Sequence, residues 1–255
     1  MKKCLFFFTF LLFVCLIMSC ELFSKPLYSF SRDISGIIGS MSTADLAGNI
    51  DKLASDPQKA ADVLNELSGR NQDEINNLSK GDKENLLKAG TSAILPVSKL
   101  GDVVEQLTNG DESMDFATIM DSLSQGAPAI NTTALETVLK DKEILKTTDA
   151  STLAFSAASL IVNTVKTESG EGSSFEDKMK AFQEAAKAAS NGDAFDAEAF
   201  KNELGGSFTE ESKAALTAAM GVADVLTGER KDEAAGVGIG GFTISDLLDK
   251  MKGGQ

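Results

Sequence analysis

Histidine and tryptophan are absent from this chain of 255 residues, and tyrosine occurs once, at Tyr28. A chain without histidine lacks the side chain best suited to proton transfer near neutral pH and the commonest zinc ligand. Its three cysteines, Cys4, Cys15 and Cys20, all lie within the first twenty residues. The ordinary routes to catalysis are therefore reduced, although carboxylates, a Ser–Lys pair or a Mg²⁺ site would still be available. We predict that the protein is not an enzyme and holds no metal ion or cofactor.

Basic residues are also scarce. The sequence has 24 Lys and Arg against 38 Asp and Glu, which gives a formal net charge of -14. So acidic a chain is repelled by nucleic acid and by anionic membrane surfaces, and we therefore expect no nucleic-acid partner. The hydrophobic fraction of 42% is ordinary for a globular protein and argues against wholesale disorder.

The first twenty residues have the organisation of a signal peptide. Two lysines precede an apolar run over residues 5–18, which at about 14 residues is shorter than the ~20 that a membrane-spanning helix needs. The run leads into the sequence LIMSC, which ends at Cys20 and has isoleucine three residues before the cysteine and serine directly before it. This pattern resembles the signal peptidase II lipobox of bacterial lipoproteins. The bulky methionine at position 18 makes it most similar to the relaxed form of spirochaetal lipoproteins.

The resemblance implies that residues 1–19 are a lipoprotein signal peptide and that Cys20 carries diacylglycerol on its thiol and an acyl chain such as palmitate on its amino group. An ordinary secretory signal would need a small residue where Ile17 stands, and an uncleaved anchor would need a longer apolar run. Cleavage removes Cys4 and Cys15, leaves no thiol for a disulfide, and changes the net charge from -14 to -16. We expect a lipoprotein anchored to a membrane through Cys20, at the periplasmic face or the cell surface. The choice between inner and outer membrane stays open.

The rest of the chain has the pattern of helices, since apolar residues recur at spacings of three and four and no segment has a convincing strand pattern. The sequence predicts an all-α protein of roughly ten short to medium helices. Residues that favour helix starts and glycines that favour helix ends punctuate the pattern. The expected starts are Asp56, Asn71, Asp82, Asp149, Ser173, Asp196 and Thr209, and the expected ends are Gly69, Gly110, Gly126, Gly192, Gly205 and Gly228.

Three long segments rich in small residues, 85–100, 152–167 and 214–229, form a weak internal repeat with a period of about 60 to 67 residues. Each follows a shorter and more polar helical segment, namely 60–69, 134–143 and 197–206. Because small residues let helices approach closely, we place the three long segments at the centre of the molecule. The arrangement is either a helical-hairpin repeat or a bundle array. Pro96 interrupts the first long segment and predicts two helices or a kink within 82–108.

The segment that follows the lipid site, residues 20–41, predicts an amphipathic tether helix beginning near Pro26. Its apolar side chains fall on one face, which makes that face a candidate for contact with a membrane or a ligand. The alternative is that the same face packs on the protein's own core. The residues of this apolar stripe are Phe23, Leu27, Phe30, Ile34 and Ile38.

The main helical domain should then span residues 42–235, and residues 236–255 should form a glycine-rich linker and a C-terminal helix over 244–251. Four glycines before that helix invite comparison with a phosphate-binding loop. No strand pattern precedes them and no Gly-Lys-Ser/Thr follows, so a linker is the better interpretation.

Taken together, these features predict a lipid-anchored, extracytoplasmic, non-enzymatic module that binds a protein partner or an apolar ligand. The alternative is a membrane-active lipoprotein whose amphipathic helices insert into the inner leaflet of an outer membrane and perturb or carry lipid. An enzyme that uses carboxylates or Ser and Lys is a further alternative. It would need a pocket in which such groups converge.

Overall fold

The computed structural model describes residues 35–53, 56–95, 120–121, 125–128, 130–170, 173–190, 195–235, 238–239 and 242–243. The expected signal peptide and lipid site, with Phe23, Leu27, Phe30 and Ile34, lie outside these residues. The chain divides into two compact units, Met1–Ile37 and Ile38–Gln255. The second unit contains the pocket described below.

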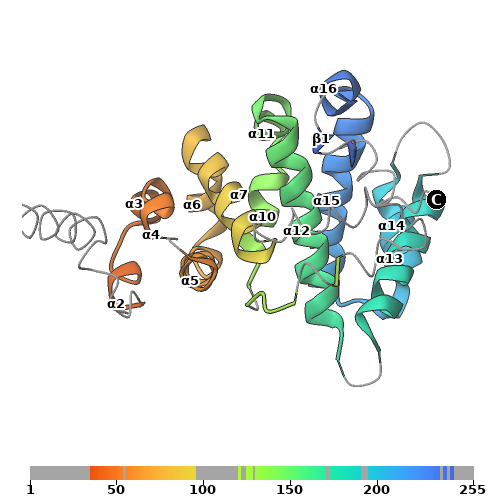
Figure 1. Ribbon diagram of the computed structural model, residues 1–255, viewed down its shortest axis with the longest axis horizontal. Helices are drawn as coiled ribbons and strands as arrows, with labels where there is room; N and C mark the ends of the chain where they lie inside the picture. The colour runs from red at the N-terminus through yellow and green to blue at the C-terminus, as the bar shows by residue number, and fades with distance from the viewer. Residues whose placement is uncertain are drawn as a thin grey trace, which may run out of the picture. The chain divides into compact units, whose positions relative to one another are not determined.

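The protein is all-α, as the sequence predicts (Figure 1). In the described residues β pairing is confined to one isolated bridge between Gly170 and Ser173 and a hairpin ladder of two-residue strands. The ladder pairs β1 (Gly238–Ile239) with β2 (Phe242–Thr243), inside the segment predicted to be a linker. No helix among the described residues is long and apolar enough to cross a membrane.

Most of the predicted helix starts are confirmed, because the side chain at the start accepts a hydrogen bond from the backbone N–H of the second or third helical residue. Glycines end three of the helices at Gly69, Gly205 and Gly228, also as predicted. Asp56 begins α5 (Pro57–Ser68), Asn71 begins α6 (Gln72–Asn76), Asp149 begins α12 (Ala150–Glu168), Asp196 begins α14 (Ala197–Leu204) and Thr209 begins α15 (Glu210–Thr227).

Two predicted starts are wrong by a few residues. Helix α7 (Lys80–Ile94) begins at Ser79 rather than at Asp82, and α13 (Phe175–Ala189) begins at Ser174 rather than at Ser173. In both cases a serine hydroxyl accepts from the backbone N–H of an aspartate three residues later. The serine supplies the cap and the aspartate stands in the first turn, where its charge favours the positive end of the helix. Of the other expected ends, Gly126 lies in a turn with φ of +78°, and Gly110 and Gly192 lie outside the described residues.

An arrangement of a short helix, a connecting helix and a long helix occurs three times in the described chain. The first set is α5, α6 and α7, and the third is α14, the 3₁₀ helix η1 (Gly205–Ser207) and α15. The second set is α10 (Thr133–Leu139), α11 (Lys142–Thr147) and α12. The long helices are the three small-residue segments of the sequence analysis, and α12 packs against both α7 and α15 (Figure 1). Helix α7 ends at Ile94, two residues before Pro96.

The core is built on these long helices. Helix α12 buries residues on every face, including Leu153, Leu160 and Ile161. Helices α13 and α14 pack together beside them, with the rings of Phe182 and Phe200 edge to face at 5.9 Å between centroids. The remaining helices are α2 (Ser35–Ile38), α3 (Thr43–Gly48), α4 (Ile50–Leu53) and α16 (Lys231–Ala235).

Candidate functional site

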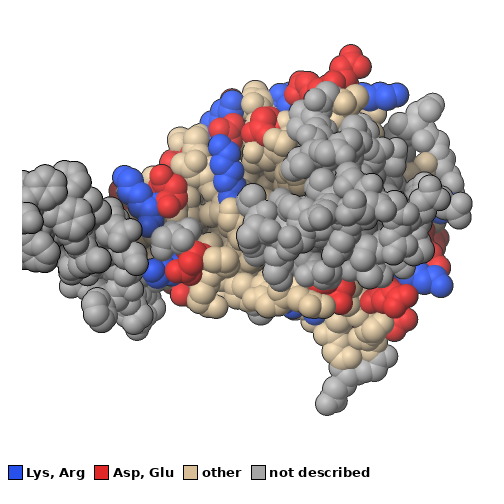
Figure 2. All heavy atoms as spheres, viewed as in Figure 1, with Lys and Arg blue, Asp and Glu red and all other residues tan. Residues whose placement is uncertain are grey.

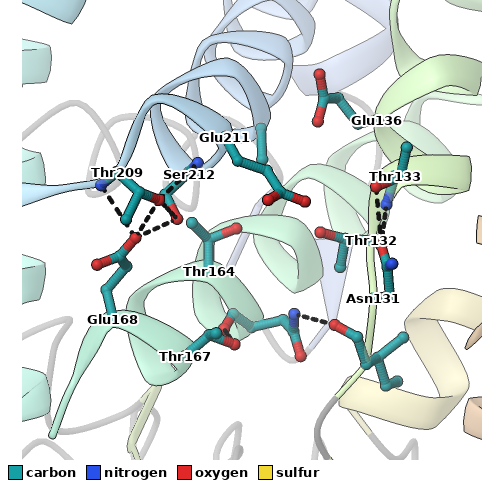
Figure 3. A pocket seen from close by; sticks show the side chains of 13 residues that line it. Asn131, Thr132, Thr133, Glu136, Thr164, Thr167, Glu168, Thr209, Glu211 and Ser212 are labelled. Carbon is teal, nitrogen blue, oxygen red and sulfur yellow. Dashed lines mark hydrogen bonds between the residues drawn. The ribbon is translucent and has the colours of Figure 1, made fainter.

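A pocket of about 320 Å³ lies where α10, the last turns of α12 and the first turns of α15 meet (Figure 3). Its lining combines six hydroxyl groups, three carboxylates and two amides with two apolar side chains. A volume of this size is within the range of small-molecule sites, although such sites are mostly apolar. The lining residues are Ile130, Asn131, Thr132, Thr133, Glu136, Asn163, Thr164, Thr167, Glu168, Thr209, Glu211, Ser212 and Ala215.

Helix periodicity gathers these side chains. Thr164, Thr167 and Glu168 stand three and four residues apart near the end of α12, so they share one helix face. Glu211 and Ala215, four residues apart, share a face of the first turns of α15. The caps of Asp149 and Thr209 determine where α12 and α15 begin, and thereby which side chains reach the pocket.

Glu168 joins the end of α12 to the start of α15. Its Oε1 accepts from the backbone N–H of Thr209 at 3.0 Å, from the Thr209 hydroxyl at 2.5 Å and from the Ser212 hydroxyl at 2.5 Å. Burial opposes ionisation of this carboxyl, but the hydrogen bonds from Ser212 and Thr209 outweigh it and hold the pKa of Glu168 below its ordinary value. The positive end of α15 acts in the same direction. Glu168 is therefore a negative charge at neutral pH.

The opposite wall is held by amide groups. Nδ2 of Asn163 donates to the backbone oxygen of Ile130 at 2.9 Å. Oδ1 of Asn131 accepts from the backbone N–H of Thr133 at 3.0 Å and from its hydroxyl at 2.8 Å. The backbone N–H of Asn131 in turn donates to Oδ1 of Asn65 on α5 at 2.7 Å. These bonds connect this wall of the pocket to α5 and α12.

One buried polar group in the pocket has no partner. Thr164 is 4% exposed, and its hydroxyl has no hydrogen-bond partner among the described residues. Figure 3 shows this hydroxyl pointing into the pocket, between Glu211 and Thr132. Elsewhere in these helices a threonine hydroxyl donates to the carbonyl oxygen four residues earlier, as Thr167 does at 2.8 Å and Thr217 at 2.6 Å. A buried hydroxyl without a partner costs about 1–3 kcal/mol, so Thr164 is an unfilled position for a hydrogen bond.

The charged side chains of the described pocket lining are all negative. Among the described residues that line the pocket the charged ones are Glu136, Glu168 and Glu211, with neither Lys nor Arg. Figure 2 shows basic and acidic side chains interspersed on the described surface seen in that view. Glu136 pairs with Lys140, which does not line the pocket. Within the described residues Glu211 makes neither a hydrogen bond nor an ion pair. In that same part of the chain no cluster of three acidic, His or Cys side chains is close enough to share a metal ion.

The described part of the apolar stripe predicted from the sequence does not line this pocket. Ile38 is the one member of the stripe within the described residues, and it is 4% exposed. Its neighbour Ile37 is 46% exposed. The sequence analysis did not identify the pocket residues. The feature of the sequence that could have indicated the pocket is the pair Asn163 and Thr164, two polar residues within the apolar run of α12.

Comparison of the chain with protein-family models, with curated proteins and with solved structures finds no match. The argument for function therefore depends on the chemistry of the pocket and on the sequence itself.

Proposed function

We propose that the protein is a lipid-anchored binding protein outside the cytoplasm, without catalytic activity, which takes a small polar ligand into the pocket between α10, α12 and α15. The unpartnered hydroxyl of Thr164 is the observation that carries the proposal. A ligand that hydrogen-bonds to it recovers free energy that the empty protein lacks. The sequence analysis expected a protein partner or an apolar ligand. Three carboxylates in the lining favour a polar one, because an apolar ligand would leave them without partners.

Binding is a better account of this pocket than catalysis. Ser212 donates to Glu168, but a serine nucleophile needs a base whose pKa lies near the working pH. The lowered pKa of Glu168 makes it a weak base, and the chain has no histidine to replace it. Hydroxyl, amide and carboxylate groups are instead the usual means of orienting a polar ligand.

Thr164→Val tests the proposal, because valine keeps the shape of threonine and removes its hydroxyl. Loss of an unpartnered buried hydroxyl should raise the free energy of unfolding by about 1 kcal/mol in the absence of ligand. The same change should reduce the stabilisation that a bound ligand provides. Both effects are measured as thermal unfolding with and without a panel of amino acids, sugars, polyols and amines.

Thr217→Val is the matched control, since the Thr217 hydroxyl donates to the backbone oxygen of Lys213 and lies outside the pocket lining. This variant should lose stability and keep its response to ligands. If no compound in the panel raises the unfolding temperature of the unaltered protein, the pocket is not a site for small polar ligands. Equal ligand responses in the unaltered protein and in Thr164→Val would contradict the role given to the hydroxyl.

Insertion of amphipathic helices into a membrane is the second candidate function. Within the described chain Ile37 is the large apolar side chain that stands exposed, and it lies next to the predicted stripe. An exposed isoleucine in a segment close to an acylated cysteine would suit contact with lipid. Flotation with lipid vesicles of chains that begin at residue 21 and at residue 42 separates this candidate from the first.

A further inference from the structure

The three carboxylates of the pocket are spread along it rather than gathered at one point. Figure 3 shows Glu168 and Glu136 at opposite sides with Glu211 between them. This spacing agrees with the lack of a metal-binding group of three acidic side chains among the described residues. One compact cation would form an ion pair with one of these carboxylates and leave the others unpaired. A molecule that carries several positive charges along its length would form an ion pair with each of them.

The charged groups in the described lining of the pocket are all hydrogen-bond acceptors, because they are carboxylates. Oε1 of Glu168 accepts three hydrogen bonds, which leave its Oε2 available as an acceptor. Nδ2 of Asn163 donates to the backbone oxygen of Ile130, and this bond leaves its Oδ1 available as an acceptor. With the carboxylate of Glu211, these atoms suit a ligand that only donates, as an ammonium group does.

The lining also limits the kind of cation. No aromatic side chain is among the described residues that line the pocket, whereas sites for quaternary ammonium groups enclose the ligand in aromatic rings. A planar guanidinium group would likewise have no ring on which to stack. Primary and secondary ammonium groups need neither an enclosure of aromatic rings nor a ring on which to stack, because they bind through N–H donors. Ile130 and Ala215 offer apolar surface to the methylene groups between two such charges.

Resting on the proposed function, we infer that the ligand of this pocket is a linear polyamine, a methylene chain that carries two or more primary or secondary ammonium groups. Glu168 and Glu211 bind successive ammonium groups, and Thr164 accepts a hydrogen bond from one of them. Glu136 contributes negative charge at the far side, although Lys140 already neutralises part of it.

Spermidine is the probe, titrated calorimetrically into the full chain held in uncharged detergent, at neutral pH and physiological salt. The inference expects a saturable heat with one spermidine per chain. Glu211→Gln removes one carboxylate that has no partner among the described residues, and affinity should fall on the order of tenfold, since a charge-assisted hydrogen bond contributes roughly that factor. Thr164→Val should also weaken binding, by about fivefold.

Glu203→Gln is the matched control, because Glu203 is an exposed glutamate on α14 outside the pocket and the substitution removes the same charge. It should leave the affinity unchanged. If Glu203→Gln and Glu211→Gln weaken binding equally, spermidine is held by the diffuse negative charge of the chain and the inference is wrong. Choline and glucose are the comparison ligands. Choline binding as tightly as spermidine would overturn the inference, because a single compact cation would then suffice.

The two proposals fail in different ways. If glucose binds in a saturable manner that Thr164→Val weakens while spermidine gives no heat, the polyamine inference is wrong and the polar binding site stands. If no compound in the wider panel binds and Thr164→Val leaves stability unchanged, both are overturned. Circular dichroism of each variant confirms that the helices are intact before either conclusion is drawn.

Discussion

Lys83 is a charged side chain inside the protein, with 6% of its surface exposed. Its Nζ donates to the backbone oxygen of Asn76 at 2.7 Å and to Oδ2 of Asp141 at 2.6 Å. Oδ1 of Asp141 also accepts from the backbone N–H of Glu143 at 2.8 Å, which begins α11. One carboxylate therefore caps a helix and neutralises a buried ammonium group. The bond ties the first set of helices to the second, because α7 belongs to one and α11 to the other.

Asp141→Asn should lower the free energy of unfolding by about 1–3 kcal/mol at neutral pH, because Lys83 would stay buried without its counter-charge. Asparagine is as good a helix cap as aspartate, so loss of the cap does not explain the expected effect. Asp196→Asn, at the start of α14, is the control, since Asp196 accepts from backbone N–H groups there and has no lysine partner. Urea unfolding of the two variants measures the difference, and equal stabilities would show that the bond to Lys83 contributes nothing.

The same pair makes stability depend on pH. The hydrogen bond from Lys83 lowers the pKa of Asp141 below its ordinary value of 3.8, against the opposing effect of burial. A carboxyl with a lowered pKa in the folded state stabilises the protein above its ordinary pKa, and the contribution is lost as pH falls through the lowered value. The stability gap between the unaltered protein and Asp141→Asn should therefore close in acid, below about pH 4.

Between elements, α7 and α10 approach closely at Gly90. A Cβ atom there would lie 2.5 Å from Cδ2 and 2.7 Å from Cδ1 of Leu135, whose side chain is 1% exposed. Glycine in the middle of a helix costs up to about 1 kcal/mol relative to alanine, so its presence indicates that close packing outweighs helix propensity.

Gly90→Ala should destabilise the protein by about 1–3 kcal/mol, since the buried side chain of Leu135 would have to move. Gly221→Ala, in the interior of α15, is the matched control, because apart from the helix's own nearby backbone no described atom lies within 4 Å of the added Cβ. That variant should gain up to about 1 kcal/mol from helix propensity. Thermal unfolding checks both signs, and stabilisation by Gly90→Ala would mean that the two helices do not meet as described.

The helices themselves were largely predictable. Their starts depend on hydrogen bonds within three residues, and for that reason Asp56, Asp149, Asp196 and Thr209 could be identified from sequence alone. The errors at Asp82 and Ser173 arose where two capping residues stood close together and local pattern did not choose between them. The connecting helices α6 and α11 are too short to show a clear periodicity.

At the scale of the whole molecule, the second and third sets of helices meet at the pocket, and the expected lipid anchor stands at the opposite end of the sequence. Cys20→Ala should abolish acylation and membrane attachment when the chain is produced in a bacterium. Mass spectrometry and fractionation into soluble and membrane material check this outcome. Identical mass shifts and fractionation for the unaltered and Cys20→Ala chains would contradict the lipoprotein assignment.

Flotation with lipid vesicles separates the anchor from the apolar stripe. Chains without lipid that begin at residue 21 and at residue 42 are compared. If the longer chain floats and the shorter does not, residues 21–41 bind membrane directly and the membrane-active function takes first place. If neither floats, acylation of Cys20 is the anchor and the pocket is where function should be sought.

The sequence by itself determined the all-α class, most helix boundaries and the central position of the three small-residue segments. Each of these depends on the spacing of residues only a few positions apart. Only the tertiary structure decided the pocket, since Asn131, Thr164 and Glu211 come from the segment before α10, from α12 and from α15, which are far apart in the chain. Threonine and glutamate are common on helices, and nothing local distinguishes a paired hydroxyl from an unpaired one. Whether the hydroxyl of Thr164 finds a partner depends on which helices pack around it, and that is a property of the folded protein alone.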